Sequence, residues 1–315
     1  MKISTTGFHG VSMRGGALGC IAAVGVAWAL PAWATEGGGQ QFPIGVDTVA
    51  PAMLPPPGQN MLLSYTVGYT ANRQNDNSGN PSQPGFDVDV FVEATKLIHT
   101  WTNLYGVDIG SGMVVGVNNT DLTVVPGVVK GHEFGMIDTD LLPIMLHADV
   151  GGGLHLGFAT NIWIPTGTYS RNNPASMGFN RTSVGLQFIT TWMPTEKWDL
   201  STSTIVEFGA KNHKTEYYSG TYTNTDFQAS YRFFDDLPRL ALGVSGYYFQ
   251  QLEDDRVNGQ IAHGTGYRGM AVALGPQIRY DAWDHGAIVL KYQHELAAEN
   301  RTQGDKFWLQ LGIPF

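Results

Sequence analysis

Charged residues are scarce in this sequence, and several of them occupy alternate positions within runs that are otherwise apolar. They make up 14% of the chain, compared with about 25% in an ordinary globular protein. Alternating charges share one face of a strand, where they either pair with one another or form a polar constriction that selects by shape and charge. The candidate site residues are Asp138, Asp140, Glu207, Asp226, Arg232, Arg279, Lys291 and Glu295, with Gln187, Gln228, Gln277 and Gln293 on the same face.

A glycine motif at residues 264–269 could bind a dinucleotide. Gly264, Gly266 and Gly269 match G-x-G-x-x-G, but such a site needs a strand before the glycines and a helix after them. Here a loop precedes them, and the alternation predicts a strand after them. Flexible loop glycines are the favoured interpretation, and no cofactor is expected.

An acidic loop, EDDRVNG, supplies oxygen ligands of the kind that calcium prefers. Glu253, Asp254, Asp255 and Asn258 lack the D-x-D-x-D-G spacing, so a solvated acidic loop is favoured over a calcium site. A divalent ion bridging this loop to lipopolysaccharide remains an alternative. His132 and Glu133 do not form H-E-x-x-H, and no G-x-S-x-G occurs. The sequence therefore predicts no catalytic residue and no metal site.

Strands must position these side chains, because the hydrophobic period after residue 60 is two rather than 3.6. In residues 154–164, for example, leucine, phenylalanine and isoleucine alternate with small or polar residues. The expected strands are 60–71, 86–95, 98–117, 133–148, 153–164, 179–193, 198–211, 221–234, 239–252, 267–282, 286–298 and 305–315, twelve in all. The strand at 98–117 is expected to contain a kink or bulge.

The connections between these strands alternate in length. Polar connections at 72–85, 118–132, 165–178, 212–220 and 253–266 are long, whereas those at 95–97, 149–152, PTEK, DDLP and WDHG are short. Aromatic residues gather near both strand ends: Trp192, Trp198, Phe233, Phe234, Tyr280, Trp283 and Phe315 beside the short turns, and Tyr69, Trp163, Tyr217, Tyr218, Tyr248, Tyr267 and Phe307 beside the long loops. Aromatic girdles and loop asymmetry are typical of outer-membrane β-barrels.

Residues 1–34 predict a secretory signal peptide. Lys2 and Arg14 precede an apolar stretch, and Ala32-Trp33-Ala34 fits a cleavage site. A lipoprotein signal at Cys20 is disfavoured because the apolar run continues past it. A retained anchor is disfavoured because the stretch is short.

The composition of residues 35–315 supports export to a membrane without spanning helices. This part has no cysteine, and its net charge is 16 − 27 = −11, which argues against nucleic acid as a partner. The chain has 40 glycines and 11% aromatic residues, but residues 35–315 contain no apolar run near the roughly 20 residues that a spanning helix needs. An all-β, antiparallel transmembrane barrel of about 12 strands is the expected fold, with short periplasmic turns and long extracellular loops.

The domain organisation is therefore a signal peptide (1–34), a Gly/Pro-rich segment (35–59) and a barrel (60–315). Residues 35–59 contain Gly37–Gly39 and Pro55–Pro57, which disfavour helix and sheet. This segment either trails in solvent or folds into the lumen as a plug.

The chain end KFWLQLGIPF alternates until its last residue. Phe307, Leu309, Leu311, Ile313 and Phe315 are expected to face lipid. The last strand should pair with Met61–Tyr69, because a barrel in lipid tolerates no open edge. Phe315 also resembles the terminal signal that the outer-membrane assembly machinery reads.

A set of motifs in order along residues 54–315 resembles the MetA-pathway of phenol degradation family, also called the SphA family. The motifs are LPPPGQN (54–60), DTDLLPIML (138–146), WIPTGTYS (163–170), MGFNRTSVGLQF (177–188), KTEYYSG (214–220), GYYFQQLEDD (246–255), ALGPQIRY (273–280) and ENRTQGDKFWLQLGIPF (299–315). Members are predicted outer-membrane channels, often encoded with genes for the breakdown of aromatic or other hydrophobic compounds. The resemblance implies that kind of solute and assigns no catalytic residue.

We therefore expect an outer-membrane channel of a Gram-negative bacterium that takes up small hydrophobic or aromatic compounds passively. Its partners would be outer-membrane lipid and lipopolysaccharide, the assembly machinery and the solute. The small residues Gly269, Ala271, Ala273 and Gly275 leave room for a path beside Arg279 and Lys291. The alternatives are a structural or surface-binding barrel with a closed lumen and, less favoured, a lipid hydrolase.

Overall fold

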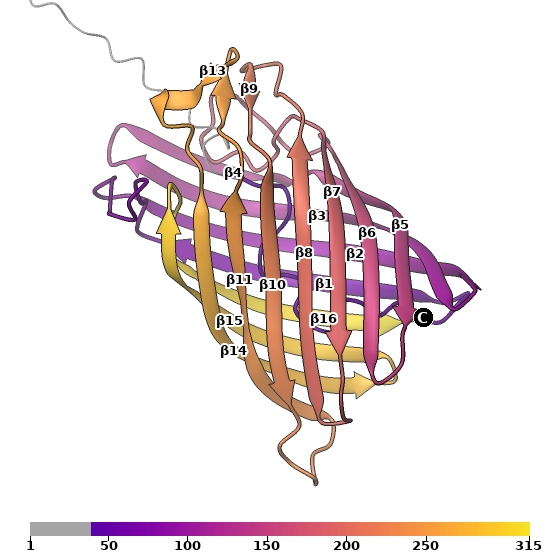
Figure 1. Ribbon diagram of the computed structural model, residues 1–315. Helices are drawn as coiled ribbons and strands as arrows, with labels where there is room; N and C mark the ends of the chain where they lie inside the picture. The colour runs from indigo at the N-terminus through magenta and orange to yellow at the C-terminus, as the bar shows by residue number, and fades with distance from the viewer. Residues whose placement is uncertain (1–38) are drawn as a thin grey trace, which may run out of the picture. The chain divides into compact units, whose positions relative to one another are not determined.

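The computed structural model describes residues 39–315, and the expected signal peptide lies outside them. Thirteen long strands form one sheet (Figure 1). They are β1 (Asn60–Ala71), β2 (Asp87–Leu104), β3 (Val107–Val125), β4 (Val129–Met136), β5 (Thr139–Asp149), β6 (Leu154–Ile164), β7 (Ser183–Trp192), β8 (Trp198–Gly209), β10 (Tyr222–Tyr231), β11 (Leu240–Gln251), β14 (Met270–Trp283), β15 (Gly286–Glu299) and β16 (Asp305–Pro314). Residues 39–315 include no helix that is long and apolar enough to cross a membrane.

The sheet closes on itself. Its order is β2-β1-β16-β15-β14-β11-β10-β8-β7-β6-β5-β3-β4, and the additional pairing of β2 with β3 joins the two ends. β4 and β5 both pair with β3 and together occupy one place in the wall. Within residues 39–315, the fold is therefore a closed antiparallel barrel of 12 strands. This confirms the predicted fold class.

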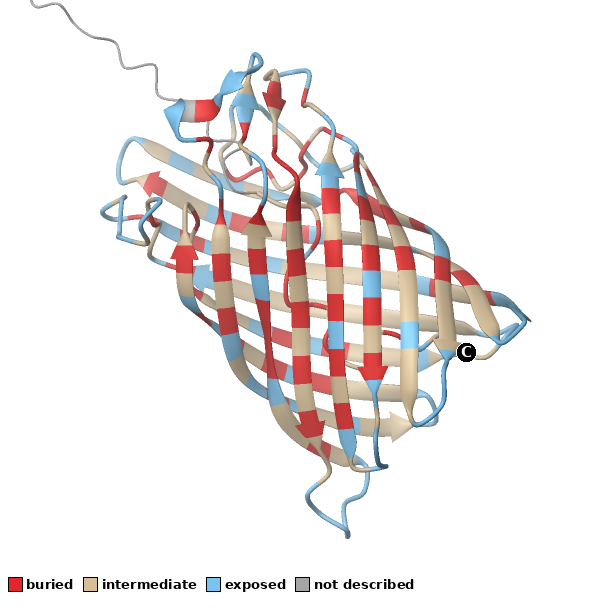
Figure 2. Cartoon of the chain, viewed as in Figure 1, coloured by how far each residue is buried: buried red, intermediate tan, exposed pale blue. Residues whose placement is uncertain are grey.

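The last strand closes the barrel against the first, as expected from the chain end. Tyr65 lies opposite Gln310, and Tyr69 lies opposite Lys306. Trp308 and Gln310 are buried inside, whereas Phe307, Leu309 and Ile313 are exposed outside. The same alternation of buried and more exposed residues runs along β7, β8 and β10 (Figure 2). It arises because successive side chains of a strand point to opposite faces.

Two ends of the barrel can be distinguished by their connections. The loop rim carries the connections 72–86, 126–128, 165–182, 210–221, 252–269 and 300–304, and the turn rim carries 105–106, 150–153, 193–197, 232–239 and 284–285. A small second sheet stands on the loop rim: β9 (Tyr217–Tyr218), β12 (Arg256–Val257) and β13 (Gln260–Ile261), followed by the short 3-10 helix η1 (Ala262–Gly264) (Figure 1).

The expected turn at residues 95–97 is wrong, and so is the long loop at 118–132. β2 runs on to Leu104, and the chain reverses at Tyr105–Gly106, where both residues have positive φ angles of 53° and 86°. Two consecutive positive φ angles are typical of the tight turns that join twisted strands. β3 then continues to Val125, leaving only residues 126–128 before β4. A charged residue such as Lys96 is typical of a loop in a sequence, but its side chain points into the barrel from within β2.

The aromatic girdle is borne out at the turn rim and only partly at the loop rim. Beside the short turns, exposed rings include Trp192, Trp198, Phe233, Phe234, Tyr280 and Phe315. Near the long loops, Tyr248 and Phe307 are exposed, but Trp163 and Tyr217 are buried. Tyr69 points inward as well, because its hydroxyl donates to Glu295 at 2.9 Å. The loop-rim prediction failed for these rings because strand position alone does not say which face a ring occupies.

Candidate functional site: the lumenal segment and its cavity

Residues 39–59, named here the lumenal segment, run through the inside of the barrel without forming a helix or strand. Phe42, Ile44 and Val46 are buried there. They pack in one cluster with inward side chains of the wall: Trp163, Ile205, Tyr222, Tyr247, Phe249, Ala271, Ala273 and Trp308. Alternate residues of the segment therefore supply its apolar contacts, while its backbone is left to bind polar groups of the wall.

Asp226 and Lys291 bind the middle of the lumenal segment. The Asp226 carboxylate accepts the N–H groups of Gly45 at 2.7 Å and Asp47 at 2.9 Å. The Lys291 ammonium donates to the carbonyl of Gly45 at 2.6 Å, the carbonyl of Val46 at 3.0 Å and the Thr48 hydroxyl at 2.9 Å. These bonds satisfy backbone groups that no strand ladder could reach.

Three more of the predicted carboxylates are also bonded inside the barrel. Glu207 accepts from the Phe42 N–H at 3.2 Å and from the Tyr222 hydroxyl. Asp138 accepts from the Gln41 side chain at 3.1 Å. Glu295 accepts the Tyr247 hydroxyl at 2.6 Å. All three are almost completely buried, so each fixes a neighbour in place.

Arg232 and Arg279 lie elsewhere, near the turn rim. Arg279 donates to Asp199 at 2.8 Å and to Asp281 at 2.6 Å, and Arg232 donates to Asp281 at 2.7 Å. This network ties β8, β14 and the end of β10 together. Neither arginine lines the cavity described next.

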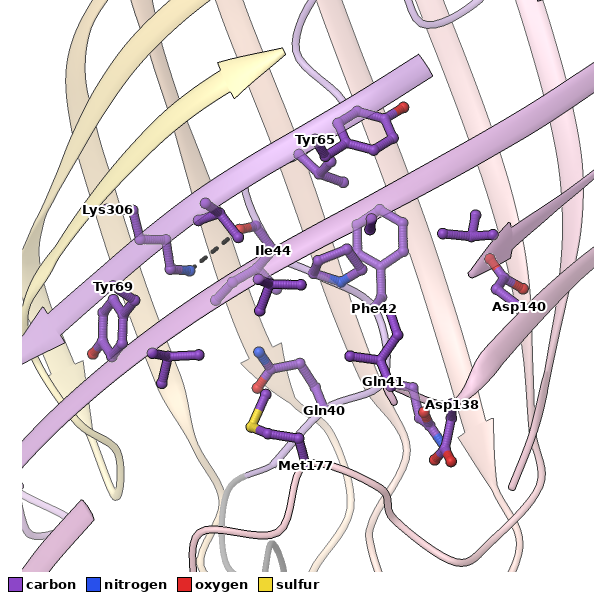
Figure 3. Close-up of a pocket in the computed structure, with 18 of the residues that line it drawn as sticks. Gln40, Gln41, Phe42, Ile44, Tyr65, Tyr69, Asp138, Asp140, Met177 and Lys306 are labelled. Carbon is purple, nitrogen blue, oxygen red and sulfur yellow. Dashed lines mark hydrogen bonds between the residues drawn. The ribbon is translucent and has the colours of Figure 1, made fainter. Parts of the chain in front are cut away.

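A cavity of about 300 Å³ lies between the lumenal segment and the wall formed by β1, β2 and β3 (Figure 3). The wall contributes Tyr65, Val67, Tyr69, Val90, Val92, Ala94 and Val114, and the segment contributes Phe42, Ile44 and Val46. Residues of two loop-rim connections also line it, Met177 and Phe179 from 165–182 and Arg301 and Thr302 from 300–304. The cavity thus extends from the loop rim into the barrel and is mainly apolar.

An apolar cluster lies beyond the inner end of the cavity, toward the turn rim. Leu54 of the lumenal segment packs there against Leu142, Met145 and Ile98 of the wall. Leu142 is fully buried. The cluster and the segment together separate the cavity from the turn rim.

The path expected beside the small residues of β14 is occupied instead. Ala271 and Ala273 are fully buried against the segment's apolar cluster, and the space beside Lys291 is filled by the backbone of Gly45 and Val46. The small residues make room for the segment. Sequence reasoning missed the cavity because the lumenal segment forms one side of it, and the alternation of the wall strands does not place that segment.

Basic residues of the cavity were also missed. Lys306 donates to the Ile44 carbonyl at 3.2 Å (Figure 3), and Arg301 donates to the Gln40 side chain at 2.7 Å. Lys96 lines the inner end. The period of two in β2 and β16 could have placed both lysines on the inner face. Lys96 lies four residues after the inward Val92, and Lys306 lies two residues before the inward Trp308.

The acidic loop on the loop rim binds its own neighbours. Glu253 accepts hydroxyl groups of Thr221 at 2.7 Å and Tyr218 at 2.9 Å, and these bonds lower the pKa of its carboxyl group. Asp255 accepts the Tyr217 hydroxyl at 2.6 Å, and burial raises its pKa. Among residues 39–315, no group of three or more His, Cys, Asp or Glu side chains could hold a metal ion.

The glycine motif has the local structure of a loop. Gly264 and Gly266 have positive φ angles of 73°, and Gly269 directly precedes β14. A strand, rather than the helix that would bind a pyrophosphate, follows the motif.

Comparison with known proteins supports the fold and identifies a family. The family model described as MetA-pathway of phenol degradation matches residues 71–311. The structure resembles an outer membrane channel from Pseudomonas putida F1, with a TM-score of 0.75 and 16% identity over 84% of this chain and 98% of that chain. It also resembles the β domain of the Bordetella autotransporter Brka, with a TM-score of 0.50 and 12% identity over 82% and 100% of the two chains. No curated protein sequence matches. At these identities the structural likeness shows the fold, that of an outer-membrane β-barrel.

Proposed function

The chain belongs to the MetA-pathway of phenol degradation family, and from this premise we propose that it is an outer-membrane channel for passive uptake of small hydrophobic or aromatic compounds. The proposal places the barrel in the outer membrane of a Gram-negative bacterium. Its outward side chains contact lipid, its loop rim faces lipopolysaccharide, and its turn rim faces the periplasm. The outer-membrane assembly machinery would insert it.

The observation that carries this proposal is the cavity between the lumenal segment and β1, β2 and β3. Its volume is about 300 Å³, and an apolar cavity of about 150 Å³ suffices for benzene. One substituted ring therefore fits. Loop residues, including the apolar Met177 and Phe179, line one end of the cavity, so a solute that reaches the loop rim meets a mainly apolar surface.

The lumenal segment is proposed to act as a plug that restricts passage. Its contacts with Asp226, Lys291 and Glu207 hold it across the lumen, and Leu54 closes the inner end of the cavity. Each hydrogen bond to a charged group contributes only about 1.5–3 kcal/mol. A local shift of the segment is thus accessible without an energy source, and uptake is passive.

A closed structural or surface-binding barrel is the second candidate. The observation that favours it is the fully bonded middle of the lumenal segment, in which Gly45, Val46, Asp47 and Thr48 all contact the wall. Such a barrel would bind partners through its loops and pass no solute.

Uptake by intact cells separates the two candidates. A radiolabelled alkylbenzene would be offered to cells with an intact lipopolysaccharide leaflet, with and without the full chain. The channel proposal expects chain-dependent entry, and it expects a variant that lacks residues 40–54 to raise the ion conductance of planar bilayers. Equal entry with and without the chain, together with unchanged conductance of the deletion variant, would establish the closed barrel.

A further inference from the structure

Four inward residues form a row across β2, β3, β5 and β6 in the wall of the cavity. Lys96 of β2 pairs with Val114 of β3, Val114 pairs with Asp140 of β5, and Asp140 pairs with Trp163 of β6. All four line the cavity. Adjacent strands lie about 4.8 Å apart, so the backbones of Lys96 and Asp140 are separated by roughly 10 Å, with the short Val114 side chain between them.

Asp140 has an acceptor that the protein leaves unused. The residue is only 6% exposed, and its Oδ1 atom has no hydrogen-bond partner. Within the described part of the chain, no ion pair joins it to Lys96. An unsatisfied buried acceptor costs about 1–3 kcal/mol, which a donor inside the cavity would recover.

Most other inward charges of the middle and upper barrel are bound to the protein. Glu207 also has an oxygen without a hydrogen bond, Oε1, but this atom lies 3.9 Å from Arg181 Nη2, and Glu207 does not line the cavity. Asp226 and Lys291 bind the lumenal segment, Glu295 accepts from Tyr247, and Lys306 donates to Ile44. For Lys96, by contrast, the structure gives no hydrogen bond within residues 39–315. Lys96 and Asp140 are thus a donor and an acceptor that face the same space and are not joined to each other.

We infer that Lys96 and Asp140 form a subsite for the hydroxyl group of a small, uncharged compound with an apolar body. A hydroxyl donates one hydrogen bond to Asp140 Oδ1 and accepts one from the Lys96 ammonium. The apolar body then packs against Tyr65, Val92 and Ala94, which line the same cavity. This inference rests on the proposed function. It implies that, among the solutes of the channel, apolar compounds with one hydroxyl group stay longest in the cavity.

Two other classes fit the subsite less well. A bare hydrocarbon leaves both Lys96 and Asp140 without partners. A carboxylate has no proton to donate to Asp140 Oδ1, so this acceptor stays without a partner. A hydroxyl group is the smallest function that satisfies both side chains at once.

Equilibrium dialysis of the purified full chain in detergent tests the subsite. The probes are benzyl alcohol, ethylbenzene and benzoate, which are close in size. Asp140→Val and Lys96→Met are each expected to weaken benzyl alcohol binding about tenfold, the usual effect of losing a hydrogen bond to a charged group. Ethylbenzene binding should change less than twofold or tighten. The exposed residues Asp121 and Lys130 provide matched controls, Asp121→Val and Lys130→Met, which should change neither.

The subsite proposal is wrong if Asp140→Val weakens the binding of benzyl alcohol and of ethylbenzene equally. It is also wrong if this substitution changes the binding of neither compound. Those are the results expected if an ordered water alone satisfies Asp140. Tighter binding of benzoate than of benzyl alcohol to the wild-type chain would overturn it too, because it indicates an anion site. The uptake assay judges the channel separately. If the compound enters cells equally well without the chain, but the two substitutions still weaken benzyl alcohol binding about tenfold, the channel proposal is wrong and the subsite proposal stands.

Discussion

Asp226 and Lys291 bind the two backbone polar groups of one residue, Gly45. Asp226 accepts the Gly45 N–H at 2.7 Å, and Lys291 donates to the Gly45 carbonyl at 2.6 Å. The two side chains come from β10 and β15, which are separated in the sheet by β11 and β14. Opposite charges thus bind the two sides of a single residue of the lumenal segment, and this arrangement fixes the segment's height in the barrel.

Replacing Lys291 with Met should release the lumenal segment while leaving the barrel closed. The substitution removes three hydrogen bonds to the segment and leaves Asp226 as a buried charge without its counter-ion, a change worth about 3–5 kcal/mol. We expect higher ion conductance in planar bilayers and new protease cleavage within residues 39–59.

Lys130 is exposed, so Lys130→Met is the control for Lys291→Met. It also removes one positive charge, but outside the lumen. Both variants should keep the difference in gel migration between boiled and unboiled samples. Wild-type conductance and protease resistance in Lys291→Met would show that the apolar contacts of Phe42, Ile44 and Val46 hold the segment alone.

A methyl group at Gly45 should also displace the segment. Gly45 has a φ angle of +87°, and an added Cβ would lie 2.3 Å from Gln293 Oε1 and 2.9 Å from the Tyr247 ring. Gly58 has a similar φ of +83° with nothing within 4 Å. Both alanine variants bear the backbone cost of about 1 kcal/mol, but only Gly45→Ala adds the clash, so only this variant should raise conductance. Equal conductance of the two variants would contradict this assignment.

The barrel could be predicted from the sequence because its signal is local. Each wall strand repeats its pattern every two residues, so Asp226 and Lys291 could be placed on the inner face without any knowledge of their partners. The turn at Tyr105–Gly106 carried the weaker signal of a single glycine. The pattern therefore predicts a turn at 95–97 instead, and this removes Lys96 from the inward face of β2, whereas Val90, Val92 and Ala94 stay within the predicted strand.

The position of the lumenal segment had no comparable signal. Its ties to the wall are mostly backbone groups, such as the Gly45 and Val46 carbonyls bound by Lys291, and a backbone group leaves no mark in a sequence. The cavity depends on this segment for one whole side. Its location could thus not be derived before the segment was placed, even though most of its wall residues lie at predictable positions.

Deleting Phe315 should lower the yield of assembled protein more than it changes conductance. The Phe315 backbone exchanges two 3.0 Å hydrogen bonds with Asn60 where the last strand meets the first, and its ring is exposed at the turn rim. Deletion removes this closing contact and the proposed assembly signal but leaves the lumen intact. Quantification of the unboiled folded band in outer-membrane fractions checks this, with Phe315→Trp as the conservative control. A normal amount of folded deletion variant would show that Phe315 is not needed for assembly.

A charge at Leu311 should block insertion. Leu311 faces outward midway between the exposed rings of Phe307 and Phe315, so it lies near the centre of the apolar band. A lysine at the midplane of a barrel's lipid face costs about 2–4 kcal/mol, and the cost falls toward zero near the interfaces. Leu311→Lys should therefore reduce the folded fraction in phospholipid vesicles by tenfold or more, estimated from about 1.4 kcal/mol per factor of ten. Leu311→Ala controls for lost volume and should fold nearly normally. If Leu311→Lys folds as well as Leu311→Ala, the face of β16 that carries Leu311 is not in contact with lipid.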